Sequence, residues 1–272
     1  MKSVLAMLGV GAAMTAAAVG ALIWAGNQQL AKDFGALPET VAGGPGDPAL
    51  GARLVSVYGC NSCHGAALTG EDFYGVVAPN LRRRAREWSC EDFARAVRHG
   101  LRPDGTSISW AMPSEMFAAM ADNEIAAIHA HLRTLPAAND AQAITLKHRL
   151  VKAFFAAMGE LIPNAVLVRA TDRGPAVAPA PGTPAWGPYF TRLACAECHN
   201  HGLGGSPEGS PALADAIQIY DWPAFVTLTT TGRPPDGRKL RLMTGVGAQR
   251  LPHMTDAERR ALFDYLKSLP QP

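Results

Sequence analysis

Two short motifs carry the clearest chemistry in this chain of 272 residues. Residues 60–64 read Cys-Asn-Ser-Cys-His, and residues 195–199 read Cys-Ala-Glu-Cys-His. Two thiols at this spacing can each form a thioether bond to a vinyl group of one porphyrin, while the adjacent imidazole binds the iron. The sequence therefore predicts two covalently attached haem c groups, with attachment through Cys60, Cys63, Cys195 and Cys198 and iron ligation by His64 and His199.

Other readings of a Cys-x-x-Cys pair expect a different context. A redox dithiol needs no histidine in that place and usually lies in a βαβ unit. A zinc site needs further Cys or His pairs nearby, and the sequence has none. Four of the five cysteines belong to the motifs, so no disulfide is predicted. The fifth, Cys90, shares a predicted helix face with Phe93 and Val97 and is expected to be a small buried residue.

Methionines are the candidate ligands for the opposite side of each iron. Sulfur ligation favours ferrous iron and suits an electron carrier. Met112 and Met243 follow an Asp-Gly turn by seven and six residues, in segments expected to be loops that arch over a porphyrin. Met116 is the rival of Met112. Met120 and Met254 directly precede predicted helices, where an apolar residue often packs as a staple.

The segments around the two motifs repeat each other. A helix is expected to begin at Pro48 and to end in the first motif, because Asp47 supplies a cap and Pro suits the first turn. After each motif comes a proline loop, at residues 79–81 and 211–213, and a carbonyl near Pro79 is a candidate acceptor for His64. Residues 120–136 align with residues 254–270 without a gap. This internal repeat predicts two mostly helical domains, at residues 49–136 and 184–272.

Composition indicates an ordinary globular protein. Hydrophobic residues make up 48%, charged residues 18%, and the net charge of +2 does not suggest nucleic-acid binding. Arginines cluster at residues 82–86; they form a solvated face, a docking patch for an acidic partner, or counter-ions for haem propionates. His99, His129 and His131 lie on predicted helices and are expected to be capping or partly exposed residues.

The N-terminal segment predicts a membrane anchor over residues 1–26. Residues 3–25 carry no charge and are long enough to cross a bilayer, although a cleaved signal peptide is the alternative. Lys2 places the N-terminus in the cytoplasm. Because haem c is assembled outside the cytoplasmic membrane, the haem domains are expected to be periplasmic, on a single-pass protein of the cell inner membrane.

Two segments outside the repeats are expected to connect the parts. Residues 27–48 become polar and then rich in Gly and Pro, which predicts a tether. Residues 137–183 form a connector that ends in a stiff Pro-rich spacer. Within it, residues 144–168 mix basic and apolar side chains. This basic amphipathic segment is expected to pack across the two domains, to lie on a membrane surface, or to contact a partner.

The two motifs, the Arg-Pro-Asp-Gly turn followed by Ala-Met-Pro, and the Asp-x-Glu helices that end in Leu-Pro resemble multi-haem cytochrome c subunits of membrane-bound bacterial dehydrogenases. Those subunits serve alcohol, aldehyde and gluconate dehydrogenases. The resemblance implies two tandem class I cytochrome c domains that pass electrons from a catalytic partner to a quinone, another cytochrome or an oxidase. Such subunits often carry three haems and a C-terminal membrane helix, whereas this chain has two motifs and an N-terminal apolar segment.

Three functional hypotheses follow. The first is an electron-transfer protein with no substrate of its own that works with redox partner proteins. The second is a haem enzyme, either a di-haem peroxidase or a sulfur-compound oxidoreductase, for which Cys90 is the candidate thiolate ligand. The third is a di-haem subunit of a terminal oxidase.

Overall fold

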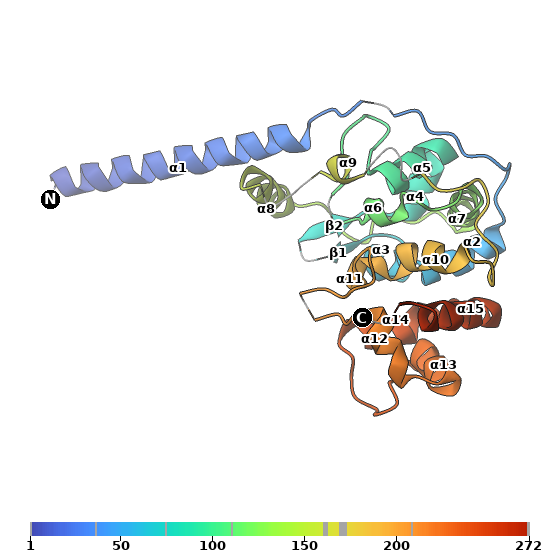
Figure 1. The fold of residues 1–272 in the computed structure, drawn as a ribbon. Helices are drawn as coiled ribbons and strands as arrows, with labels where there is room; N and C mark the ends of the chain where they lie inside the picture. The colour runs from blue at the N-terminus through green and yellow to red at the C-terminus, as the bar shows by residue number, and fades with distance from the viewer. Residues whose placement is uncertain are drawn as a thin grey trace.

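The computed structural model consists of two helical domains and a long N-terminal helix that projects from them (Figure 1). The predicted mostly α fold is confirmed. Helix α1 (Lys2–Leu30) crosses α8 (Leu146–Ala157), which belongs to the connector together with α9 (Asn164–Leu167). The structure describes residues 2–35, 37–73, 75–109, 111–159, 163–168, 173–207 and 209–270, without the side chains of residues 2–10, Ala12 and Phe73.

The first domain is helical apart from one small hairpin. Strands β1 (Glu71–Phe73) and β2 (Val76–Ala78) pair antiparallel, with Glu71 opposite Ala78. The helices are α2 (Pro48–Val57), α3 (Cys60–His64), α4 (Leu81–Glu87), α5 (Cys90–His99), α6 (Ser114–Phe117) and α7 (Asp122–Thr134).

The second domain repeats the order of the first. Its haem motif again follows a helix, and its last helix again begins just after a buried methionine. The elements are α10 (Trp186–Ala194), α11 (Ala196–His199), α12 (Leu213–Ala216), η2 (Ile217–Ile219), α13 (Trp222–Thr231), α14 (Leu242–Gln249), η3 (Leu251–His253) and α15 (Asp256–Lys267).

In each domain the helix before the motif packs closely across the last helix. A Cβ atom at Gly51 of α2 would overlap the backbone of Ala127 in α7, and one at Gly187 of α10 would overlap the ring of Tyr265 in α15. Glycine is therefore needed at both crossings, because any side chain would force the helices apart. The crossing fixes the start of each haem motif against the core of its own domain.

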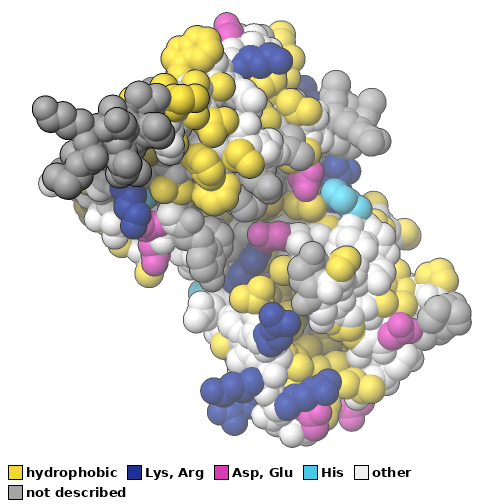
Figure 2. Space-filling model, turned by 90° about the vertical axis from the view of Figure 1, so that its left-hand side faces the viewer, with side chains coloured by type: hydrophobic (Ala, Val, Ile, Leu, Met, Phe, Trp, Pro, Cys, Tyr) yellow, Lys and Arg dark blue, Asp and Glu magenta, His cyan; other side chains and the backbone are white. Residues whose placement is uncertain are grey.

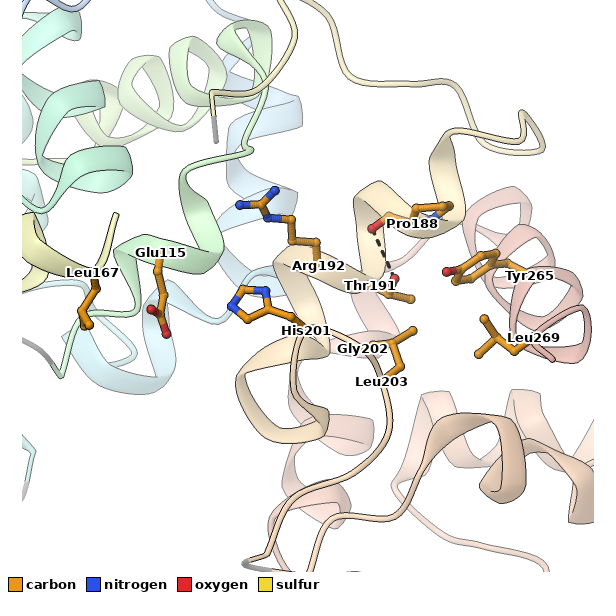
Figure 3. A pocket seen from close by; sticks show the side chains of 10 residues that line it. All are labelled: Glu115, Leu167, Pro188, Thr191, Arg192, His201, Gly202, Leu203, Tyr265 and Leu269. Carbon is orange, nitrogen blue, oxygen red and sulfur yellow. Dashed lines mark hydrogen bonds between the residues drawn. The ribbon is translucent and has the colours of Figure 1, made fainter. Parts of the chain in front are cut away.

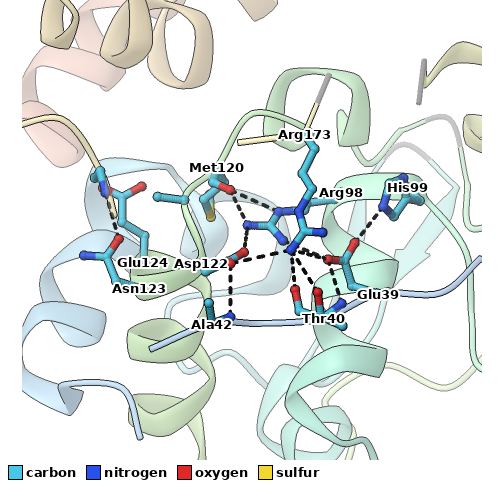
Figure 4. Close-up of polar contacts among 12 residues, drawn as sticks. Glu39, Thr40, Ala42, Arg98, His99, Met120, Asp122, Asn123, Glu124 and Arg173 are labelled. Carbon is cyan, nitrogen blue, oxygen red and sulfur yellow. Dashed lines mark hydrogen bonds and ion pairs between the residues drawn. The ribbon is translucent and has the colours of Figure 1, made fainter. Parts of the chain in front are cut away.

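Both predicted spacers lie against the first domain (Figure 4). The buried carboxylate of Glu39, from the predicted tether, pairs with Arg98 at 3.0 Å and with His99 at 2.7 Å. Arg98 also pairs with Asp122 at 2.6 Å, and Arg173 of the connector lies 3.5 Å from both carboxylates. Buried charges persist when they are paired in this way. His99, the last residue of α5, is thus held by its contact with Glu39.

The N-terminal helix α1 spans 29 residues. Among helices whose side chains are described, none is both long and apolar enough to cross a membrane. The structure does not bear out the transmembrane helix that was predicted over residues 1–26. Much of that apolar run, namely the side chains of residues 1–10 and of Ala12, lies outside the part of the chain that the structure describes.

Candidate haem-binding sites

The first motif forms its own short helix, α3, after a break at Gly59. Gly59 adopts a left-handed conformation with φ 73°, so α2 ends before the motif instead of running into it as predicted. The His64 side chain is buried, and its Nδ1 donates a hydrogen bond to the carbonyl of Pro79 at 2.8 Å. The predicted acceptor is confirmed. Burial lowers the pKa of His64, which favours the neutral imidazole that a metal requires.

The second motif repeats this hydrogen bond, although His199 is only partly buried. His199 Nδ1 donates to the carbonyl of Pro211, also at 2.8 Å. In both motifs the hydrogen bond fixes the tautomer and the ring orientation and leaves Nε2 available for iron. The repeated contact is the strongest geometric sign that residues 60–64 and 195–199 fit the same cofactor.

The motif cysteines form no disulfide and are partly buried. Burial raises the pKa of the Cys60 thiol to about 11 and that of the Cys195 thiol to about 12. Within the described part of the chain, no group of three or more His, Cys, Asp or Glu side chains is placed to hold a metal ion. This geometry fits thioether attachment of haem and gives the zinc reading no support.

Met112 lies in the turn before α6 and packs, partly buried, against the hydrophobic core. Its amide donates to the carbonyl of Ser109 at 3.0 Å. From the connector, the buried side chain of Asn164 donates to the carbonyl of Met112 at 2.6 Å and to that of Ser109 at 2.8 Å. Asn164 therefore clamps the turn that carries the predicted ligand. Sequence reasoning missed it, because one asparagine in a connector has no distinctive pattern.

The other methionines differ in burial. Met243 lies on the first turn of α14, a helix, whereas the sequence predicted a loop; its side chain also packs partly buried against the core. Met120 and Met254 are almost fully buried, as expected for apolar staples before α7 and α15. Met116 is also buried, on α6. Iron ligation by Met112 and Met243 stays a prediction, and so does Met116 as the alternative ligand in the first domain.

The two motifs lie side by side at the centre of the molecule (Figure 1). Arg250, which follows α14 in the second domain, packs so close to Gly59 that a Cβ there would overlap its guanidinium. Burial raises the pKa of all four motif cysteines, and the positive charge of Arg250 opposes that rise at each of them. One cation therefore serves both sites.

The Arg250 side chain also contains an orphaned polar atom. Its Nε is buried and has no hydrogen-bond partner among the described residues. A buried donor of this kind normally has an acceptor. The position beside both motifs fits an anionic group such as a haem carboxylate. Sequence reasoning missed Arg250, because nothing in its local sequence distinguishes it from a surface arginine.

Equivalent glutamates of the two repeats hold the domains together. Glu124 of α7 accepts hydrogen bonds from Tyr189 of α10 and, at 2.9 Å, from Tyr58. Glu258 of α15 pairs with Arg53 of α2 at 2.6 Å. Each glutamate thus contacts the helix before the haem motif of the other domain. These contacts fix the position of one motif relative to the other.

A cavity of about 640 Å³ lies between the domains, beside the second motif (Figure 3). Glu115 from α6 and His201 from the loop after the second motif face it from opposite domains, and Arg192 of α10 lines it as well. None of the predicted haem ligands lines it. Its complete lining is Glu115, Leu167, Pro188, Thr191, Arg192, His201, Gly202, Leu203, Tyr265 and Leu269.

The arginine cluster of residues 82–86 lies on α4. Arg83 pairs with Asp140 at 2.8 Å, and Arg84 pairs with Glu87 at 2.6 Å. These exposed pairs contribute little stability. They support the interpretation as a solvated face.

Two further candidate ligands have other roles. Burial raises the pKa of Cys90 to about 11, and its side chain packs against the core, which disfavours a thiolate. His129 Nε2 donates to the carbonyl of Trp88 at 3.2 Å. Cys90 thus packs against the core as a small apolar residue, but it is only partly buried, whereas the sequence predicted a buried one.

Comparison with known proteins agrees with this geometry. Residues 189–270 match the family model of cytochrome c, and residues 46–132 match the model of cbb3-type cytochrome c oxidase subunit III. Each match contains one of the Cys-x-x-Cys-His motifs. The fold and the sites therefore define tandem cytochrome c domains.

Two curated relatives are similar over most of the chain. The cytochrome c subunit of the quinone alcohol dehydrogenase of Gluconobacter oxydans (strain 621H) is 26% identical over 270 residues, which cover 81% of this chain and 54% of the relative. A diheme cytochrome c-type protein of Cereibacter sphaeroides is 25% identical over 275 residues, covering 86% and 89%. This chain thus spans about half the length of the first relative. It is a di-haem c-type cytochrome, and its cofactors are two covalently bound haem c groups.

Proposed function

We propose that the chain is a membrane-anchored periplasmic relay that takes electrons from a dehydrogenase or respiratory partner and passes them to a downstream cytochrome, quinone or oxidase. The observation that carries this proposal is the placement of two haem motifs side by side around Arg250. A bound haem supplies an iron that gains and loses single electrons. Two such centres in one rigid chain suit transfer through the molecule.

The chain's own residues hold and tune the two centres. Cys60, Cys63, Cys195 and Cys198 would attach the haems; His64 and His199 would bind iron through Nε2; and Met112 and Met243 would supply sulfur ligands. Ligation by both imidazole and thioether would suit an electron carrier.

Membrane anchoring rests on the N-terminal segment. Residues 3–25 are uncharged, and a 29-residue helix such as α1 is about 43 Å long, which exceeds the hydrocarbon thickness of a bilayer. The proposed orientation has a cytoplasmic N-terminus and both haem domains in the periplasm, as a single-pass protein of the inner membrane.

Purification of the full chain in mild detergent, followed by mass spectrometry of co-purifying proteins and reduction assays, tests the relay. The proposal predicts a dehydrogenase or respiratory complex in the preparation, and haem reduction when that partner's substrate is added. Peroxide turnover by the purified chain, together with a high-spin or thiolate-ligated haem in electron paramagnetic resonance, would show that the protein is a haem enzyme and would contradict the proposed electron relay.

A second candidate is a di-haem subunit of a terminal oxidase. The match of residues 46–132 to subunit III of cbb3-type oxidases favours it. Co-purification with a copper- and haem-containing oxidase, and electron delivery from this chain to oxygen through that oxidase, would select this candidate over the dehydrogenase partner.

A further inference from the structure

Helix α8 exposes an apolar face that no described part of the protein covers. Its larger apolar residues recur at helical spacing, whereas the small residues Ala153 and Ala156 are buried on another side. Figure 2 shows hydrophobic side chains gathered on the side of the molecule from which α1 projects. Those of α8 and the residue after it are Leu146 (70% exposed), Leu150, Val151, Phe154, Phe155 and Met158.

The small residues of α8 allow it to cross α1 at close range. A Cβ atom at Gly26 of α1 would overlap the carbonyl of Ala153. In Figure 1, α1 runs across the picture while α8 is seen nearly along its axis, so the two helices cross steeply. If α1 spans a bilayer, α8 therefore lies roughly parallel to the plane of that bilayer.

Aromatic residues mark the level of the crossing. Trp24, which is 65% exposed, lies two residues before Gly26. Phe154 and Phe155, one and two residues after Ala153, are also exposed and contact each other edge to face. Aromatic side chains at one level are typical of the boundary between hydrocarbon and headgroups.

The charges of α8 complement an anionic surface. The helix carries Lys147, Arg149 and Lys152 and contains no Asp or Glu. Lys147 and Arg149 are both exposed, Lys147 on the side of α8 that carries Phe154 and Arg149 on the side that carries Ala156. Exposed basic residues on a helix with an exposed Leu and Phe face are characteristic of helices that lie in the headgroup region of anionic membranes.

We infer that α8 is an interfacial helix that inserts its Leu and Phe face into an anionic phospholipid surface at the periplasmic end of α1. This inference rests on the membrane anchoring proposed above. The helix also contacts the first domain, since Nε2 of His148 lies 3.1 Å from the carboxylate of Asp72 in β1. The haem domains are then held at the membrane surface instead of on a free tether.

Spin labels on the full holoprotein test this placement. Phe155→Cys, Met14→Cys and Ile219→Cys are each labelled in a Cys90→Ala background and reconstituted with reduced haems in vesicles of phosphatidylcholine and phosphatidylglycerol. A label that oxygen relaxes more strongly lies in lipid, and a label that a soluble nickel chelate relaxes more strongly lies in water. The labels at residues 155 and 14 should be relaxed more strongly by oxygen. The label at residue 219 in the second domain should be relaxed more strongly by the nickel chelate.

The three labels separate the outcomes. Residue 14 in lipid with residue 155 in water overturns the inference for α8 and leaves the anchor intact. Both in water overturns the anchor as well, without affecting electron transfer between the haems. Low accessibility of residue 155 to both reagents overturns the lipid inference in favour of a protein contact.

A charge variant tests the choice of lipid. Lys147→Gln with Arg149→Gln should bring the label at residue 155 closer to water in anionic vesicles, and vesicles of phosphatidylcholine alone should do the same to the unmodified helix. Arg238→Gln, at an exposed site of the second domain, is the matched control and should change nothing. An unchanged depth in both cases would contradict the role of anionic lipid.

Discussion

Arg250 of the second domain packs its guanidinium group against Gly59, the residue immediately before Cys60 of the first haem motif. The charge of Arg250 also acts on Cys195 and Cys198 of the second motif. A partly buried cation beside two haem sites stabilises the reduced state of each, because reduction lowers the positive charge of the iron. Arg250, at the interface of the two domains, therefore acts electrostatically on both haem sites.

Arg250→Gln should lower both midpoint potentials, by about 59 mV at each haem if the cation changes each redox equilibrium tenfold. Spectroelectrochemical titration of the holoprotein measures this. Arg260→Gln, which removes an exposed arginine paired with Asp264, should leave both potentials unchanged. A shift confined to one haem would mean that Arg250 serves one site only.

Met112→Ala and Met243→Ala should each remove the sulfur-to-iron band in the near infrared from one haem and lower the potential of that haem alone, because the thioether favours ferrous iron. Met116→Leu is the matched control for the first domain and should retain both bands. A band that survives Met112→Ala but disappears in Met116→Leu would assign the ligand to Met116.

Asn164→Ala should weaken iron ligation in the first domain, since it removes the donors that hold the carbonyls of Ser109 and Met112. The sulfur-to-iron band of the first haem should weaken and become temperature-sensitive, while that of the second haem stays intact. Asn123→Ala removes another contact of the connector, with the amide of Ala178, and serves as the control. Equal loss at both haems would indicate general unfolding.

The ion pairs of Glu39 should make the first domain sensitive to acid. Burial alone would raise the pKa of Glu39, but the hydrogen bond with His99 and the charges of Arg98 and Arg173 together lower it below 4.5. Their contribution to stability is complete above pH 4.5 and is lost as the pH falls through the lower folded-state value. Glu39→Gln should cost on the order of 3 kcal/mol at neutral pH and much less in acid.

Urea unfolding of the holoprotein, followed by tryptophan fluorescence at several pH values, measures this loss. Glu91→Gln, on the first turn of α5, is the control and should leave the pH dependence unchanged. A Glu39 variant whose stability falls in acid as steeply as that of the unmodified chain would contradict the assignment.

Local sequence signals predicted the elements that hold each haem. Asp47 caps α2 by accepting from Ala49 at 2.8 Å, and Thr255 and Glu258 form a capping box at the start of α15. The hydrogen bond from His64 to Pro79 was also predictable, because a ligating imidazole needs an acceptor and the loop was the nearest candidate. These features depend on residues close together in the chain.

The missed features depend on contacts between distant segments. Gly59 turns left-handed beside Arg250, which is far from it in sequence, so the break between α2 and α3 was not predicted. Asn164 reaches the Met112 turn from the connector, and Glu39 reaches Arg98 from the predicted tether. No periodicity or motif encodes such pairs. They follow only from the packing of the two domains and the segments that join them.

Injection of a single electron into the fully oxidised holoprotein by a laser flash tests the relay most directly. The account predicts that the electron equilibrates between the two haems at a rate independent of protein concentration, since the motifs are fixed side by side within one chain. Arg250→Gln should change the final distribution little, because it lowers both potentials together. A rate that rises in proportion to protein concentration, so that electrons pass only between molecules, would contradict the account.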